Sequence, residues 1–300
     1  MRITSARRSW LFLQGAARDS LLQAARSGAD IAIQDLEDFT PHDLKDEARR
    51  LSSEVCRRWR ENQVVPAVRI TPLAEAGEVD TRAAVSAGAD IIVVAKAETG
   101  EQIREIDRLI SYYEGRYERA HGEVEICPTI ESPAALTALT DIAGASVRVR
   151  SAILASEDLA TNLGVTRTIR SAELRYARSR FLFECSANGI LAVDCPFTFD
   201  DDKAAQLDLH WAADLGYRAK SVVHASHVGL VNAGLAPSRE ALENAAGLVD
   251  AFEQAERDGL GQVTFQGRIV ELPAYKAAKE LLAGTELLVG TDTGLLDTEE

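Results

Sequence analysis

The chain has 300 residues, and 46% of them are hydrophobic, so it can bury a single large core. Its 47 acidic and 33 basic residues give a net charge of −14, and no basic stripe interrupts this acidity, which argues against nucleic acid as a partner. No apolar run approaches the roughly 20 residues that span a bilayer, so we expect no membrane partner either.

Eight short apolar runs, rich in β-branched residues, predict eight buried strands. A stretch with helical periodicity follows each run. Strands that alternate with helices indicate a parallel sheet, and eight such units within residues 1–235 fit a closed (β/α)8 barrel, the TIM barrel. The runs are 10–13, 31–33, 64–68, 91–94, 124–126, 152–154, 190–193 and 221–223.

The chain continues beyond the eighth run with a C-terminal extension, residues 236–284. Pro237-Ser238 starts a helix expected over 241–256, and glycines at 259 and 261 predict a turn before a strand-like segment, 263–265. A last helix is expected over 274–282. The tail 285–300 is rich in Gly, Thr and acidic residues, and we expect it to be mobile.

The four cysteines have no CxxC spacing and lie beside apolar residues. This pattern favours buried thiols over disulfides or metal ligands, and it indicates a reducing, cytoplasmic location. The cysteines are Cys56, Cys127, Cys185 and Cys195.

Carboxylates follow three of the predicted strands, at the edge where barrels of this kind carry their active sites. Clustered carboxylates repel one another unless a cation intervenes, and Mg2+ is usually held by one or two carboxylates together with waters and substrate oxygens. The sequence therefore indicates a possible Mg2+ site. These acids are Asp35, Glu37 and Asp38 after the second strand, Glu131 after the fifth and Asp158 after the sixth.

A structural role is an equal alternative for these acids. Asp38 and Asp158 could be helix N-caps, and Glu37 and Glu157 could pair with lysines on the surface. The spacing alone does not separate the two interpretations.

Two basic residues end the third and fourth strands. Arg69 needs an anionic partner at a barrel mouth, and its planar guanidinium suits the carboxylate of a substrate. An ion pair with Glu131 or Asp35 is the alternative. Lys96 could bind an anion or serve as a partner of the acid cluster.

Motifs along most of the chain resemble one known family. They are Arg8-Ser9-Trp10-Leu11-Phe12, Asp35-Leu36-Glu37-Asp38, Val68-Arg69-Ile70, Pro128-Thr129-Ile130-Glu131-Ser132, Ser156-Glu157-Asp158-Leu159 and Ala192-Val193-Asp194. In this order they resemble the citrate lyase β-subunit-like branch of the HpcH/HpaI aldolase family, from about residue 7 to 280. The resemblance implies a Mg2+-dependent carbon–carbon lyase. Its substrates would be a 2-oxo acid and an acyl-CoA, joined as citramalyl-CoA, malyl-CoA or β-methylmalyl-CoA.

The resemblance also implies roles for the acids. Glu131 and Asp158 match the family's Mg2+ ligands, and Glu37 and Asp38 match acids that hold metal-bound waters and take part in catalysis. These four residues would form the metal centre.

The substrate-binding residues implied by the resemblance are Arg69, Asp35 and Lys96. Arg69 matches the residue that binds the oxo-acid carboxylate and stabilises enolate charge. The segment 265–273 resembles the family's lid motif, in which Glu271 stands where an Asp is usual and would exchange a proton with the acyl carbon. In the family this acid reaches a neighbouring subunit, so we expect residues 236–284 to pack on that neighbour in a homotrimer or homohexamer.

Two other activities are compatible with the same motifs. A malyl-CoA thioesterase would direct water at the thioester, and a citryl-carrier-protein lyase subunit would act on a thioester delivered by a carrier protein within a larger complex. The long C-terminal extension favours the lyase that acts on free CoA esters.

Overall fold

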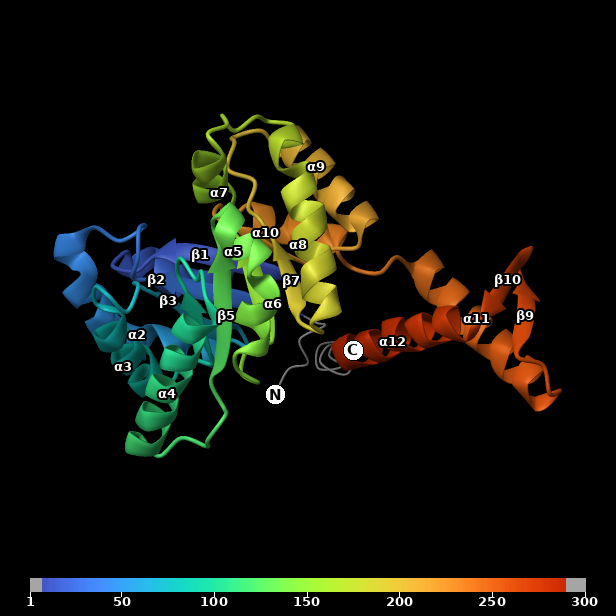
Figure 1. The fold of residues 1–300 in the computed structure, drawn as a ribbon, viewed down its shortest axis with the longest axis horizontal. Coiled ribbons are helices and arrows are strands. Elements are labelled where there is room, and N and C mark those ends of the chain that lie inside the picture. Colours follow the sequence, from blue (N-terminus) through green and yellow to red (C-terminus); the bar gives the residue numbers. More distant parts are fainter. Residues whose placement is uncertain (1–6, 290–300) are drawn as a thin grey trace, which may run out of the picture. The chain divides into compact units, whose positions relative to one another are not determined.

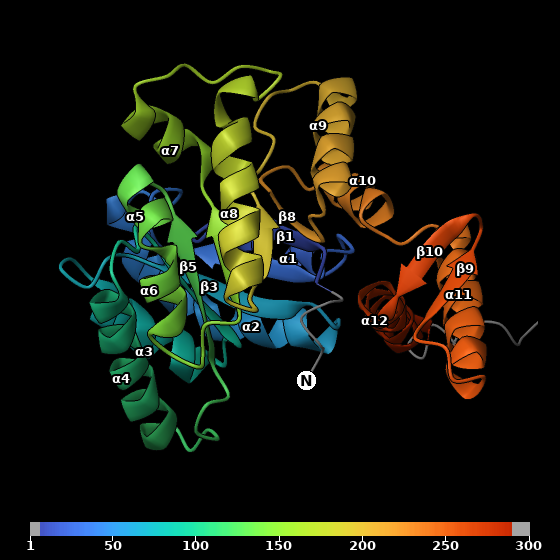
Figure 2. The ribbon, with the colours of Figure 1, turned by 45° about the vertical axis from the view of Figure 1, so that its right-hand side comes forward.

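The computed structural model describes residues 7–289, with side chains described as far as residue 283. Eight parallel strands pair in sequence order and close into a barrel (Figure 1), in which β1 lies beside β8 (Figure 2). This confirms the predicted TIM barrel. The strands are β1 (Ser9–Gln14), β2 (Ile31–Asp35), β3 (Val65–Ile70), β4 (Ile91–Val94), β5 (Glu125–Ile130), β6 (Ser151–Leu154), β7 (Leu191–Asp194) and β8 (Ala219–Val222).

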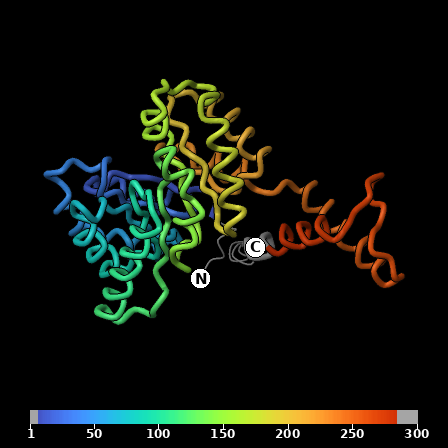
Figure 3. The backbone as a smooth tube through the Cα atoms, in the orientation of Figure 1, coloured from blue at the N-terminus to red at the C-terminus, as the bar shows by residue number. Residues whose placement is uncertain are grey.

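Helices connect successive strands and lie around the outside of the barrel, as Figures 2 and 3 show. They are α1 (Arg18–Ala24), α2 (Lys45–Glu61), α3 (Gly77–Ala87), α4 (Gly100–Arg116), α5 (Pro133–Thr137), α6 (Leu139–Gly144), α7 (Ser156–Leu163), α8 (Arg175–Ala187), α9 (Asp202–Leu215) and α10 (His227–Gly234), with short 3-10 turns η2 (His42–Leu44) and η3 (Ala172–Leu174).

Helix α4 illustrates why these segments are helical. Thr99 and Gln102 form a reciprocal capping box at its start, which satisfies backbone N–H groups that have no partner within the helix. Ile103, Ile106 and Ile110 recur at helical spacing and are buried against the sheet layer. The helix is therefore held by one apolar stripe.

Residues inside the barrel follow the period of two that a strand imposes. Ile31 and Ile33 on β2, and Ala67 on β3, belong to the cluster that fills the interior. By the same alternation, Asp35 and Arg69 also point into the barrel, in the layer at the carboxyl ends of the strands. The strand register pairs these two residues directly.

The predicted chemistry of the cysteines is confirmed: all four are free and buried. Burial disfavours the thiolate and raises the pKa of Cys56 and of Cys127 to about 12. Such thiols are unreactive core residues.

The described residues divide into two compact units, Arg7–Leu235 and a second unit that begins at Ala236. Within the second unit, α11 (Arg239–Arg257) lies beside α12 (Leu272–Val289), and Phe252 stacks on Tyr275 with ring centroids 4.7 Å apart. The last helix was expected to end near residue 282, but it extends to Val289. Residues 290–300 of the predicted tail lie outside the described residues.

Strands β9 (Gln262–Phe265) and β10 (Arg268–Glu271) form an antiparallel hairpin between these helices. Gln266 and Gly267 both have positive φ, 48° and 77°, as a two-residue hairpin turn with the right twist requires. The first strand was expected, whereas the second was recognised only as part of a motif. Within residues 7–289 no helix is both long and apolar enough to cross a membrane.

Candidate active site

Arg69 and Asp35 form the centre of the site. Arg69 donates to both carboxylate oxygens of Asp35, from Nε at 2.8 Å and from Nη2 at 2.5 Å. Of the two ion pairs considered from the sequence, the one with Asp35 is formed. Burial alone would lower the pKa of Arg69, but the charge of Asp35, its hydrogen bonds to Arg69 and the charges of Glu37 and Glu131 together raise it, so this arginine stays charged.

Asp35 is fully buried, and its carboxylate also organises the loop that follows β2. The backbone N–H groups of Glu37 and Phe39 donate to its two oxygens at 2.8 and 2.9 Å. Both oxygens are thus engaged by Arg69 and the loop. Asp35 holds Arg69 and the loop in fixed positions.

Glu37, Asp38 and Lys96 form a second cluster beside this pair. Lys96 Nζ lies 2.5 Å from Glu37 and 3.2 Å from Asp38, and Arg69 Nη1 lies 3.3 Å from Glu37. Burial raises the pKa of Glu37 despite these cations, whereas hydrogen bonds involving Lys96 and Glu37 lower the pKa of the more exposed Asp38 against its own desolvation. Lys96 was expected either to bind an anion or to pair with the acid cluster, and in the structure it pairs with these acids.

Glu131 lies just beyond β5, and only 4% of it is exposed. Its Oε1 accepts hydrogen bonds from Thr129 Oγ1 at 2.5 Å and from the Lys96 backbone N–H at 3.1 Å. Lys96 has a left-handed backbone, φ 52°, which few non-glycine residues adopt. Burial, and next to it repulsion from the nearby charge of Asp158, raise the pKa of Glu131.

The N-cap interpretation of the acids is wrong. Asp158 lies in the first turn of α7, whose N-cap is Ala155, and no side chain caps that helix. Asp38 caps no helix either, because the next helical turn, η2, has Pro41 at its N-cap. Glu157 pairs with an arginine, Arg167, at 3.2 Å rather than with a lysine.

A cavity of about 100 Å³ opens at the carboxyl ends of the strands. Polar side chains on its wall include Arg69, Thr129 and Asp158, and Ser221 contributes from β8. This volume is well below the several hundred cubic ångströms of pockets for drug-sized ligands. The cavity therefore suits a small acid.

Two aromatic residues that sequence reasoning missed hold Arg69 in place. The rings of Phe12 and Phe39 lie 5.3 and 5.4 Å from the Arg69 guanidinium carbon, and both line the cavity. Phe12 is two residues beyond the interior residue Trp10, so the alternation of β1 could have placed it. Phe39 lies in the loop after β2, where no strand alternation predicts the direction of its side chain.

The acids at the strand ends are few but suit one kind of metal ion. No group of three or more His, Cys, Asp or Glu side chains that could hold a metal ion occurs in the described part of the chain. Glu131 and Asp158 supply two carboxylates as oxygen ligands, and a bound cation would relieve the repulsion between them. Two carboxylates fit Mg2+, which keeps several waters, and do not fit a closed zinc site.

Seven of the eight predicted site residues thus belong to the barrel unit. They are Asp35, Glu37, Asp38, Arg69, Lys96, Glu131 and Asp158. The eighth, Glu271, belongs to the C-terminal unit, where it is the last residue of β10 and has an exposed side chain.

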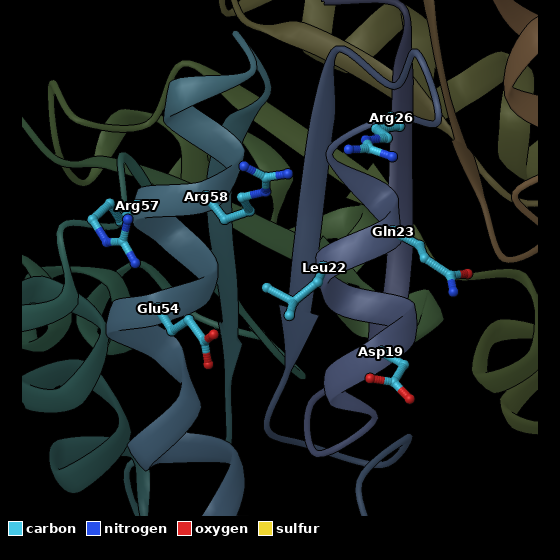
Figure 4. Close-up of a pocket in the computed structure, with 7 residues that line it drawn as sticks. All are labelled: Asp19, Leu22, Gln23, Arg26, Glu54, Arg57 and Arg58. Carbon is cyan, nitrogen blue, oxygen red and sulfur yellow. The ribbon is translucent and has the colours of Figure 1, made fainter.

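A second hollow, of about 420 Å³, lies between α1 and α2 on the outside of the barrel (Figure 4). It is lined by Asp19, Arg26, Glu54 and Arg57 among others. Arg57 pairs with Glu61 of its own helix, and Glu54 pairs with Arg18 across the two helices. These are ordinary surface pairs, so this hollow is not the candidate site.

A model of the HpcH/HpaI aldolase/citrate lyase family matches residues 8–225, the stretch that holds the seven barrel residues of the site. The chain belongs to this family. It is a carbon–carbon lyase of the citrate lyase β type, as the resemblance implied.

Similar proteins extend this match along the chain. The chain is 31% identical over 288 residues to the citrate lyase subunit beta of Escherichia coli (strain K12), with 95% of each covered. It is 28% identical over 305 residues to the L-malyl-CoA/beta-methylmalyl-CoA lyase of Rhodobacter capsulatus, with 93% of this chain and 95% of that one covered. The crystal structure of CitE from Mycobacterium tuberculosis has the same fold, with a TM-score of 0.72 at 24% identity over 93% of this chain and 98% of that one.

Proposed function

We propose that the protein is a Mg2+-dependent lyase that cleaves or forms a 3-hydroxyacyl-CoA from a 2-oxo acid and an acyl-CoA. The observation that carries the proposal is a cavity at the strand ends whose wall holds Asp158 and the buried Arg69, with Glu131 close enough for both charges to act on its pKa. Citramalyl-CoA, malyl-CoA and β-methylmalyl-CoA are the candidate thioesters.

Glu131 and Asp158 would be the direct ligands of Mg2+, and Glu37 and Asp38 would hold its waters. Bound Mg2+ supplies Lewis-acid polarisation of the oxygen that becomes the ketone. Thr129 and the Lys96 backbone N–H hold one oxygen of Glu131, which fixes the direction of the carboxylate.

Arg69 would bind the carboxylate of the oxo acid while it holds Asp35. Asp35 occupies the edge formed by Nε and Nη2, and Glu37 lies 3.3 Å from Nη1; of the five guanidinium N–H groups, one on Nη1 and one on Nη2 are then left for a substrate. A second carboxylate fits these two N–H groups end-on. The same charge offsets the negative charge that develops on the enolate when the carbon–carbon bond breaks.

Glu271 would protonate the departing acyl carbon during cleavage and remove the same proton during synthesis. Its exposed position at the end of a hairpin suits an acid that acts on a site of a neighbouring subunit. A homotrimer or homohexamer would bring the two parts together.

Two of the similar proteins support the choice of substrates and metal. The R. capsulatus relative is named for malyl-CoA and β-methylmalyl-CoA, and the M. tuberculosis CitE structure is a complex with magnesium, acetoacetate and coenzyme A. Both agree with a site that joins a small acid to an acyl thioester.

Calorimetric titration of Mg2+ into the purified protein tests the metal site. Glu131→Gln and Asp158→Asn should each lose most of the Mg2+ affinity and the lyase activity while the fold is kept. Glu157→Gln removes a neighbouring charge from the same cavity without removing a proposed ligand, so it should bind Mg2+ nearly as tightly as wild type. Wild-type Mg2+ affinity in both ligand variants would disprove the site.

The reaction is tested with a panel of malyl-, citramalyl- and β-methylmalyl-CoA in the presence of Mg2+. A lyase releases a 2-oxo acid together with an acyl-CoA. A thioesterase would release free CoA and a hydroxy acid without any oxo acid. Inactivity on every free CoA ester, with activity on a carrier-bound thioester, would indicate the citrate lyase type of complex instead.

A further inference from the structure

A hollow of about 620 Å³ lies between α8 and α9, on the outside of the barrel unit. The two helices lie side by side (Figure 2), and the ion pair between Arg178 and Asp208 joins them at 2.6 Å. The hollow shares no lining residue with the cavity at the strand ends. Its volume falls within the range of small-molecule pockets, so it is a separate place with room for an organic ligand.

Basic side chains outnumber acids in the wall of this hollow, by four to two. Three of the basic residues, Arg170, Arg175 and Lys203, are exposed and make no ion pair with an acid in the described part of the chain. The whole chain has a net charge of −14, so these three exposed cations form a local positive field on an acidic protein.

The two acids of the wall are engaged by other groups. Asp208 lies 2.6 Å from Arg178 and 2.9 Å from Lys220. Asp201 is the N-cap of α9, and its side chain accepts a hydrogen bond from the backbone N–H of Ala204 at 2.9 Å. Since no described carboxylate pairs with the three exposed cations, a ligand is left to neutralise them.

Two of these cations lie where the helix itself disfavours them. Arg175 is the first residue of α8, and Lys203 is the second residue of α9. A helix carries partial positive charge at its start, so an unpaired cation in the first turn is unfavourable. An anion in the hollow would offset this repulsion in both helices.

The wall also offers apolar surface. Ile169 and Leu207 are 42% and 70% exposed, and Trp211 is partly exposed. The guanidinium carbons of Arg175 and Arg178 lie 5.9 and 4.3 Å from the centroid of the Trp211 ring. Inorganic phosphate would leave the apolar side chains in water, whereas a ligand with a flat apolar group would cover them.

From these observations we propose that the hollow between α8 and α9 binds a phosphorylated small molecule with a planar apolar group, of the chemical class of a nucleoside diphosphate. The three exposed cations bind the phosphate groups, whose oxygens accept several charge-assisted hydrogen bonds at once. Ile169 and Leu207 contact the planar group. The inference goes beyond the proposed function, because the hollow lies apart from the residues assigned to the reaction.

Calorimetric titration of ADP into the full-length protein tests the ligand class. Mg2+ is left out, because it binds the phosphates of ADP and the proposed metal site. ADP should bind saturably, pyrophosphate about tenfold more weakly because it lacks the apolar group, and adenosine not measurably. Absence of ADP binding, equal affinity for pyrophosphate and ADP, or equal affinity for adenosine and ADP would overturn the inference.

Tryptophan fluorescence shows whether ADP reaches this hollow. Trp10 and Trp59 are fully buried, so Trp211 is the tryptophan that a ligand in the hollow can contact. Saturation with ADP should change the emission of wild type, and Trp211→Phe should remove that change. An ADP-dependent change that persists in Trp211→Phe would place the ligand elsewhere.

Arg170→Gln and Lys203→Gln locate the bound phosphates. Each variant should weaken ADP binding about tenfold, as expected when a hydrogen bond to a charged group is lost. Arg218→Gln is the matched control, because Arg218 is exposed, makes no ion pair among the described residues and does not line the hollow. It should bind ADP as wild type does. Wild-type affinity in both site variants, or an equal loss in Arg218→Gln, would show that this hollow is not the site.

Discussion

Arg69 combines a structural and a chemical role at the level of the single residue. Asp35 holds it side-on, and Phe12 and Phe39 lie against its faces, so its remaining N–H groups point in a fixed direction. Such preorganisation removes the entropy cost of ordering a long side chain at each binding event. The ion pair and the substrate role, considered as alternatives from the sequence, are therefore compatible.

Arg69→Lys should weaken binding of the oxo acid although it keeps the positive charge. An ammonium has no planar fork, so it cannot hold Asp35 side-on and a second carboxylate end-on together. We expect a loss of at least about tenfold in kcat/KM, measured by steady-state kinetics with the preferred thioester.

Asp35→Asn is the companion variant. It leaves Arg69 charged but removes the side-on partner, so it should raise KM for the oxo acid in the synthetic direction while Mg2+ affinity is retained. Wild-type kinetics in both variants would show that Arg69 neither binds substrate nor needs Asp35.

The β9–β10 hairpin is the element on which the proposed acid depends. Positive φ at Gln266 and Gly267 makes the tight turn, and only Val270 in β10 is buried, so the hairpin has little core of its own. Its register sets Glu271 opposite Gln262 at the end of the strand pair. The direction of Glu271 is thus fixed by backbone hydrogen bonding.

Glu271→Ala should still bind Mg2+ and the oxo acid but lose carbon–carbon cleavage, because only the proton transfer at the acyl carbon is removed. Glu271→Asp should keep activity, since Asp is the usual acid at this position of the motif. The measurement is the rate of oxo-acid release, with calorimetry as the binding control. An active Glu271→Ala variant would remove Glu271 from the mechanism.

Buried charges hold β7, β8, α8 and α9 together at the scale of the whole barrel. Arg178 and Lys220 each contact both Asp194 and Asp208 at 2.6–2.9 Å. Burial by itself would raise the pKa of Asp208. The positive charges of Lys220 and Arg178, with their hydrogen bonds to Asp208, together lower this pKa to about 2. The folded barrel therefore binds a proton at Asp208 less readily than the unfolded chain does.

The barrel should lose stability as the pH falls from about 4 to about 2, because Asp208 titrates near pH 4 when unfolded and near pH 2 when folded. The contribution is about 2 kcal/mol, fully present above pH 4. Asp208→Asn should lower the urea midpoint at pH 7 and flatten its decline below pH 4. Asp214→Asn, which changes an exposed residue of the same helix, is the control and should change neither.

Subunit mixing tests whether Glu271 acts on a neighbouring site. Inactive Glu271→Ala and inactive Asp158→Asn proteins, dissociated together and reassembled, should regain part of the activity, because some sites would combine an intact metal pair with an intact Glu271. Mixed oligomers that exchange subunits but stay inactive would show that each chain completes its own site.

The sequence by itself determined the architecture. Eight apolar runs of three to five residues, rich in β-branched side chains and each followed by a helical period, leave a closed parallel barrel as the fold that buries them, and all eight runs became strands. It also placed Arg69, Glu131 and Asp158 at strand ends, because the carboxyl ends of parallel strands meet on one face. Local pattern suffices for both, since strand period and chain direction are local properties.

Tertiary structure alone decided which charges pair. The side-on contact of Arg69 with Asp35 depends on the register between β2 and β3, and the hydrogen bond from Lys96 to Glu131 depends on a left-handed backbone at Lys96. The place of Phe39 against Arg69 depends on a loop held by Asp35. These contacts join residues distant in sequence through packing and register, whose energies no local pattern encodes.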